Sequence, residues 1–150
     1  MFCRSLLAGL PGVVLVAAVA GAAEKAVGPY QQQVAQQLAL LASEDGARRA
    51  GAAESLGYLR AHAAEEALIA RLQDASAEVR RQAAMALGWC GGRKAVAALL
   101  LALDDRDWLA RQAAHVALTN LTGMEFAFNA LAVPEERTSQ AQAWRDWWAR

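Results

Sequence analysis

The chain has 150 residues, a length that suits one domain, and its 15 basic and 15 acidic residues leave no net charge. This balance argues against the strongly basic surface that binding to nucleic acid or to an anionic membrane requires. Hydrophobic residues make up 56% of the sequence, and alanine, the strongest helix former, supplies much of that fraction. Valine, isoleucine and threonine, which favour strands, are sparse and scattered. We therefore expect an all-α protein.

Residues 1–23 have the pattern of a secretory signal peptide. Arg4 precedes an uncharged apolar run, and the run ends in small residues of the kind that a signal peptidase accepts. We expect the mature chain to begin between Gly21 and Glu24, after a short leader that directs export to the periplasm or to the medium. Residues 24–32 are then expected to form a linker. The apolar run approaches the roughly 20 residues that span a bilayer, so an uncleaved membrane anchor is the alternative.

Cleavage of the leader would also decide which cysteines the mature chain keeps. Cleavage would remove Cys3 and leave Cys90 alone, and a single cysteine forms no internal disulfide. Cys90 lies in the sequence GWCGG at the end of a predicted helix. We expect a small, half-buried turn residue there, because no second cysteine or nearby histidine activates the thiol. An intermolecular disulfide or a redox thiol is the alternative.

A period of 31 residues organises the chain between about residues 33 and 123. The stretch DASAEVRRQAAMALGWCGG begins at Asp74, and DRDWLARQAAHVALTNLTG begins at Asp105 with the same pattern. A third, less similar copy, SEDGARRAGAAESLGYLR, begins at Ser43. Equivalent positions hold the same residue type in the three copies: Arg49, Arg80 and Arg111; Ala52, Ala83 and Ala114; Leu56, Leu87 and Leu118.

Each copy is predicted to be a helix, a turn and a second helix. The upstream apolar segments, such as AVAALLLAL, have helical spacing. The turn residues Asp45, Ser76 and Asp107 are types that cap a helix by accepting a backbone N–H bond. Gly57 and Gly88 lie where a left-handed residue would end the second helix. A single helix pair of this size cannot bury its apolar face, so we expect three stacked pairs, a short α-solenoid.

The repeats resemble HEAT repeats, in particular the short bacterial kind related to phycobilisome-lyase repeats. The resemblance covers about residues 33–123, and DASAEVRRQAAMALGWCG and DDRDWLARQAAHVAL carry it best. It is specific for the fold and weak for function, because the same repeats serve many unrelated proteins.

The resemblance also implies a role for the repeated arginines. In HEAT repeats, a turn aspartate and an arginine six residues later commonly bridge neighbouring repeats. Asp74 with Arg80 and Asp105 with Arg111 match that spacing, whereas Ser43 takes the place of the first aspartate. We expect a structural ladder, with a row of arginines that binds anions as the alternative.

The sequence offers no constellation for catalysis or metal binding. The only histidines, His62 and His115, lie far apart, and neither precedes a glutamate of the His-Glu pairs by which HEAT-like hydroxylases bind iron. No serine lies in a nucleophile-elbow pattern, and the glycine-rich GWCGG lacks the lysine of a phosphate-binding loop. We therefore expect no catalytic, metal or cofactor-binding residues.

The expected function is non-enzymatic: a protein-binding, scaffold or assembly module that acts outside the cytoplasm on a protein partner, without nucleic acid. A membrane is expected only if the N-terminal apolar segment stays uncleaved. The resemblance implies an alternative, a lyase-type enzyme or enzyme subunit related to HEAT-like phycobilin lyases. Those lyases are usually longer and act in the cytosol of phototrophs, so the size and the predicted leader of this chain argue against that activity.

The second helices of a HEAT array line its concave side, where partners usually dock. On this side we expect a binding patch formed by Tyr58, Arg81, Met85, Trp89 and Gln112. Aromatic residues, methionine and arginine are enriched at protein interfaces. Packing of the two aromatic residues over the inter-repeat turns is the alternative.

Residues 124–150 are expected to cap the last repeat, whose apolar end would otherwise remain open. Pro134 is suited to begin a helix, and three tryptophans near the C-terminus have the i, i+3, i+4 spacing of one helix face. We expect this Trp-rich capping helix to close the open end. The aromatic residues assigned to the cap are Phe126, Phe128, Trp144, Trp147 and Trp148. Stacking of a ligand on exposed tryptophans is the alternative.

Overall fold

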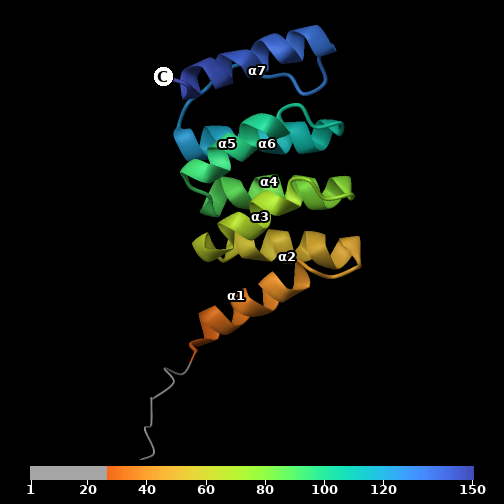
Figure 1. Ribbon diagram of the computed structural model, residues 1–150, viewed down its shortest axis with the longest axis vertical. Coiled ribbons are helices and arrows are strands. Elements are labelled where there is room, and N and C mark those ends of the chain that lie inside the picture. Colours follow the sequence, from red (N-terminus) through yellow and green to blue (C-terminus); the bar gives the residue numbers. More distant parts are fainter. Residues whose placement is uncertain (1–26) are drawn as a thin grey trace, which may run out of the picture.

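The computed structural model describes residues 27–150, which form an elongated stack of helices (Figure 1). The expected leader and its cleavage site lie outside the described residues. Within residues 27–150 there are seven α-helices, one 3-10 turn and no strand, which confirms the all-α prediction. No helix of this part has the length and apolar character needed to cross a bilayer.

Three helix pairs succeed one another along the stack. The first helices of the pairs are α1 (Pro29–Leu40), α3 (Glu65–Arg71) and α5 (Arg93–Ala102). The second helices are α2 (Gly46–Tyr58), α4 (Ala77–Cys90) and α6 (Trp108–Thr122). A last helix, α7 (Pro134–Trp148), lies across the end of the stack (Figure 1). The predicted three-repeat α-solenoid with a C-terminal Trp-rich helix is therefore confirmed.

The first helix begins earlier than the repeat boundary expected at residue 33. Pro29 is the first residue of α1, so residues 29–32 are helical although they were assigned to the linker 24–32. Proline is favoured at this position because its ring presets the helical φ and its missing N–H would have no partner there.

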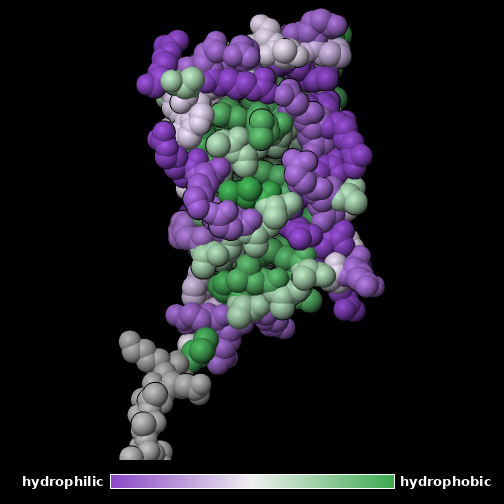
Figure 2. All heavy atoms as spheres, in the orientation of Figure 1, coloured by the Kyte–Doolittle hydropathy of each residue, from purple (hydrophilic) through white to green (hydrophobic). Residues whose placement is uncertain are grey.

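The core between the helix layers consists mainly of alanine and leucine, many of them at the repeated positions. The three equivalent leucines Leu56, Leu87 and Leu118 are fully buried, as are Leu68, Leu99 and Leu103. Figure 2 shows apolar side chains along the middle of one face of the stack, with polar residues on both margins. The 31-residue period thus brings the same apolar positions of successive repeats into one continuous core.

The expected helix caps are present in two of the three repeats. The Asp45 carboxylate accepts a hydrogen bond from the Ala47 amide at 2.8 Å. Asp107 likewise accepts from the amides of residues 109 and 110 at 3.0 and 3.1 Å. Ser76 occupies the equivalent position but forms no such bond; its own amide donates to Asp74 at 2.9 Å, so the aspartate organises this turn.

Gly57 and Gly88 do not end their helices, contrary to the prediction. Both lie inside a second helix, where neighbouring helices approach too closely for a side chain. A Cβ atom on Gly57 would lie 2.9 Å from the Cα of Ala86, and one on Gly88 would lie 2.9 Å from the Cα of Ala117. Among the described glycines only Gly123, directly after α6, has a left-handed conformation, with φ of 67°.

This packing leads to opposite predictions for two helical glycines. We expect Gly88→Ala to lower the free energy of unfolding by about 1–3 kcal/mol, because the backbone of α6 must move to accept the methyl group. Gly51→Ala is the matched control, since a Cβ there meets nothing within 4 Å. We expect it to stabilise the protein by about 0.5–1 kcal/mol through helix propensity. Urea unfolding of both variants is the measurement, and a change of the same sign in both would contradict this account.

Candidate functional site

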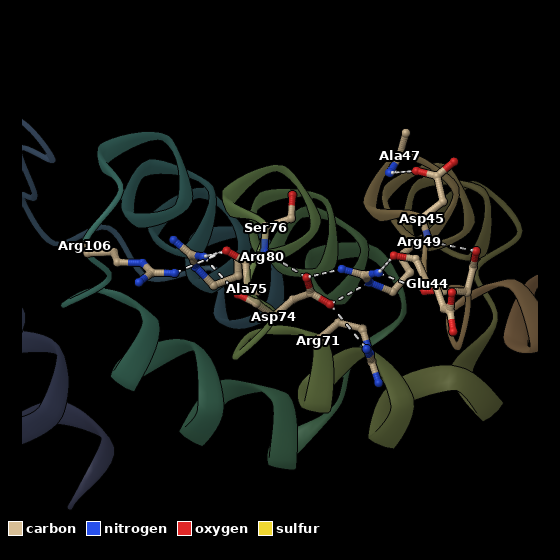
Figure 3. A network of polar contacts seen from close by, with 11 residues as sticks. Glu44, Asp45, Ala47, Arg49, Arg71, Asp74, Ala75, Ser76, Arg80 and Arg106 are labelled. Carbon is tan, nitrogen blue, oxygen red and sulfur yellow. Dashed lines mark hydrogen bonds and ion pairs between the residues drawn. The ribbon is translucent and has the colours of Figure 1, made fainter.

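A ladder of arginine–aspartate pairs joins neighbouring repeats, and Figure 3 shows its first pair, Arg49 with Asp74. Arg49 donates from Nε and Nη2 to the two carboxylate oxygens of Asp74, both at 2.8 Å. Arg80 forms the same bidentate pair with Asp105, at 2.8 and 3.0 Å. Each pair joins the second helix of one repeat to the turn of the next. Bridging of neighbouring repeats is therefore observed, but each carboxylate pairs with the arginine 25 residues before it.

The six-residue spacing seen in the sequence reflects a different contact. The Nη1 atom of each ladder arginine donates to the main-chain carbonyl six residues before it: Ser43 at 2.8 Å, Asp74 at 2.9 Å and Asp105 at 2.6 Å. Every residue type offers a carbonyl oxygen, so Ser43 does not interrupt the ladder. No further repeat supplies a turn aspartate for the last arginine, Arg111. It donates from Nε and Nη2 to the carbonyl of Ala130 instead, at 3.0 and 2.6 Å.

The ladder is a structural element, because its charges are buried and already paired. Arg80 and Asp105 side chains are only 6% and 9% exposed. Hydrogen bonds from Arg49 outweigh the effect of burial and lower the pKa of Asp74 to about 2. A polar hollow of about 400 Å³ lies beside these pairs, but Asp74, Arg80 and Asp105, which line it, are already engaged with one another. This arrangement favours the ladder over the anion-binding alternative.

The lowered pKa of Asp74 predicts a contribution to acid unfolding. The folded protein binds this proton less readily than the unfolded chain does, since the pKa falls from 3.8 to about 2. The stabilisation of the fold by the ionised Asp74 carboxylate is therefore present above about pH 4 and is lost as the pH falls towards 2. We expect wild type to lose about 2 kcal/mol more than Asp74→Asn over this range, in urea unfolding at pH 5, 4, 3 and 2. Equal losses in the two proteins would contradict the assignment.

The C-terminal helix presents an aromatic face to the third repeat. Trp144 is fully buried, and Phe126 of the preceding loop meets it edge-on, with ring centroids 4.9 Å apart. The imidazole of His115 in α6 lies 5.9 Å from the same indole, and its Nε2 atom donates to the Phe126 carbonyl at 3.0 Å. Arg145 forms an ion pair with Asp104, which fastens α7 to the end of α5. These contacts agree with the expected closure of the third repeat by aromatic residues.

Trp147 and Trp148 are only half-buried, unlike Trp144. They line a shallow groove of about 340 Å³ together with Val96 and Leu121. The guanidinium carbon of Arg93 lies 4.6 Å from the centroid of the Trp148 ring. The burial of Trp144 removes it from the ligand-stacking alternative, which stays open only for its two neighbours.

The solvent-facing side of α2, α4 and α6, here called the second-helix face, holds all five residues of the expected patch. Tyr58 is 69% exposed and stacks on Trp89, with ring centroids 5.2 Å apart and planes inclined by 30°. Trp89 is half-buried and packs over Gly57 of the preceding repeat. Trp89 therefore has the packing role considered as an alternative, whereas Tyr58 offers an aromatic surface to solvent.

A hollow of about 140 Å³ lies between α4 and α6 on the same face. Its lining residues are Arg81, Met85, Leu109, Gln112, Ala113 and Val116. Three of the expected residues therefore come together at one hollow, and Tyr58 and Trp89 lie beyond it towards α2. Glu78 holds the guanidinium group of Arg81 in a bidentate pair, at 2.6 and 3.0 Å.

Leu109, Ala113 and Val116 line the hollow but were not among the five expected residues, and Leu109 is the most exposed of the three. Its equivalents in the other repeats are Ala47 and Glu78, so the 31-residue period gives no indication of an apolar position. Leu109 and Val116 lie seven residues apart, two turns along one face of α6. That helical spacing was the signal available in the sequence.

Cys90 and the histidines form no reactive centre in the described part. Cys90 is fully buried as the last residue of α4, rather than half-buried in a turn. Its thiol donates to the Ala86 carbonyl at 3.2 Å, and burial raises its pKa to about 11. His62 donates from Nδ1 to the Cys90 carbonyl at 2.9 Å. Within residues 27–150 no group of three or more His, Cys, Asp or Glu side chains is placed to hold a metal ion.

Comparison with known proteins agrees with the repeat architecture. A family model described as HEAT repeats matches residues 34–119, which is more than half of the chain. The match covers the three helix pairs apart from the first turn of α1 and the end of α6. A search of curated proteins finds no match.

Proposed function

Because the chain belongs to the HEAT repeats family, we propose that it is a non-enzymatic protein-binding or scaffold module whose partner docks on the second-helix face. Repeats of this kind generally mediate protein–protein interaction, and their stacked helices offer an extended surface. The single observation that carries the proposal is the hollow between α4 and α6, with the exposed, stacked Tyr58 nearby. An aromatic residue beside an apolar hollow is typical of the anchoring positions in protein interfaces.

Site-specific photo-crosslinking in cells that produce the chain tests this proposal. A benzophenone side chain at position 112 lies at the rim of the hollow, on the exposed residue Gln112. The matched control has the same side chain at the exposed residue Ala97 of α5, a first helix. We expect a discrete crosslinked species from position 112 that position 97 does not form. Crosslinks from position 97 alone, or equal crosslinks from both, would rule out the second-helix face as the docking surface.

We further propose that this module acts outside the cytoplasm. The support is the leader-like pattern of residues 1–23. Intact-mass measurement of protein recovered from an exporting host is the test, with an expected N-terminus between Gly21 and Glu24. A mass that retains the whole segment would contradict cleavage and favour a membrane anchor.

A further inference from the structure

On the second-helix face, the charges of three carboxylates act on one cation, Arg81. The pKa of Arg81 is raised, first by hydrogen bonding with Glu78 and then by the negative charges of Glu78, Glu54 and Asp107. Arg81 is thus surrounded by three carboxylates, and Glu78 already neutralises it. Glu54 is exposed and forms no ion pair within residues 27–150. An unpaired carboxylate on a docking surface favours a cationic group on the partner.

The unpaired carboxylate lies beside the exposed aromatic stack. Glu54 and Tyr58 are separated by four residues on α2, so both point from the same side of the helix, about 6 Å apart. Tyr58 in turn stacks on Trp89. A lysine or arginine side chain placed over the tyrosine face gains a cation–π contact and approaches the carboxylate at the same time.

The hollow between α4 and α6 suits a second, apolar side chain. Its lining is formed by Met85, Leu109, Val116 and the methyl group of Ala113, with Arg81 and Gln112 at the polar positions. Its volume is about 140 Å³. A cavity of about 150 Å³ is enough to hold a benzene molecule, so this hollow accepts one aliphatic or aromatic side chain.

The two features are separated by a distance that an extended chain spans. Met85 and Trp89 lie four residues apart on α4, or about 6 Å along the helix axis. The hollow and the stack lie on opposite sides of α4, so about one helix spacing of 8–10 Å separates them across the face. The combined separation is about 11 Å, which corresponds to about three residues of an extended strand.

We propose that the second-helix face binds an extended segment of a partner protein that carries a lysine or arginine three residues from an apolar side chain. The basic side chain lies over Tyr58 beside Glu54, and the apolar side chain enters the hollow lined by Met85 and Val116. This inference rests on the proposed function, because it names the chemistry of the partner that docks there.

Selection from a phage library of random 12-residue peptides tests the inference with the folded chain as bait. We expect wild type to enrich peptides with a basic and an apolar residue three positions apart. Glu54→Gln and Tyr58→Ala should retain the apolar enrichment and lose the basic one. A selected peptide should bind each of these variants about fivefold to twentyfold more weakly than it binds wild type. This difference in affinity should become smaller at high salt. Glu66→Gln and Leu101→Ala, at exposed positions of the first helices α3 and α5, are the controls and should leave affinity unchanged.

The outcomes separate the inference from the proposed function. Peptides that block the crosslink from position 112 but lack the basic residue would overturn the inference. They would leave the second-helix face in place as the docking surface. Basic enrichment that persists in Glu54→Gln and Tyr58→Ala would also overturn it. If wild type selects no peptide that depends on the second-helix face, and position 112 forms no crosslink in cells, both the inference and the proposed function fail.

Discussion

Replacement of Trp144 by alanine is expected to lower the free energy of unfolding by about 3–5 kcal/mol. Trp144 is the largest fully buried side chain, and its ring is surrounded by Phe126, His115 and Trp147. Its loss leaves a cavity between α7 and the third repeat, which a rigid stack of helices cannot close. Chemical unfolding monitored by circular dichroism provides the measurement.

Two variants make the test of Trp144 specific. Trp108→Ala removes a tryptophan that is 44% exposed, and we expect it to cost less than half as much. Trp144→Phe keeps a buried ring and removes an indole N–H that has no hydrogen-bond partner within residues 27–150, so its cost should be far below that of Trp144→Ala. Equal losses for Trp108→Ala and Trp144→Ala would contradict the capping role.

The cap also has an expected effect on association. Deletion of residues 134–150 removes α7 and exposes the apolar end of the third repeat that Trp144 covers. We expect the shortened chain to self-associate or to unfold at lower denaturant concentration, because terminal repeats need a polar outer face. A shortened chain that stays monomeric in sedimentation analysis and unfolds like the parent would refute the cap, and would favour a ligand-binding role for Trp147 and Trp148.

Replacement of Arg80 by alanine is expected to lower the free energy of unfolding by about 3–5 kcal/mol. The buried arginine satisfies both oxygens of Asp105 and the carbonyls of Asp74 and Ala75. Its removal leaves a carboxylate that is 9% exposed without its cation, which costs more than the pair contributed. Urea unfolding at neutral pH is the measurement.

Arg81→Ala is the matched control, since it removes a neighbouring arginine whose ion pair is largely exposed. The Arg81 and Glu78 side chains are 37% and 50% exposed, and we expect a loss below about 1 kcal/mol. A double variant, Arg80→Met with Asp105→Leu, should recover part of the loss, because an apolar pair of similar size leaves no buried charge. A loss for Arg80→Ala no larger than that for Arg81→Ala would show that the ladder does not stabilise the stack.

Local features of this chain were readable from the sequence because their cause is local. The alanine content, the 31-residue period and the helical spacing of the apolar positions predicted stacked helix pairs, which the structure confirms. Pro134 and the spacing of the three tryptophans likewise predicted a capping helix with one aromatic face. The helical spacings act within a few turns of one helix, where backbone geometry alone sets which residues are neighbours, and the period repeats the same helix pair along the chain.

Contacts between repeats were decided by the tertiary structure. The spacing of Asp74 and Arg80 suggested a bridge between neighbouring repeats, but only the stacking shows which residues form it: Asp74 pairs with Arg49 of the preceding repeat. Gly88 was read as a helix end, yet it is required by the approach of α6 to α4. Leu109 becomes part of the hollow only because α4 lies beside it. The register between neighbouring helices depends on side-chain packing over the whole interface, and no short stretch of sequence contains that information.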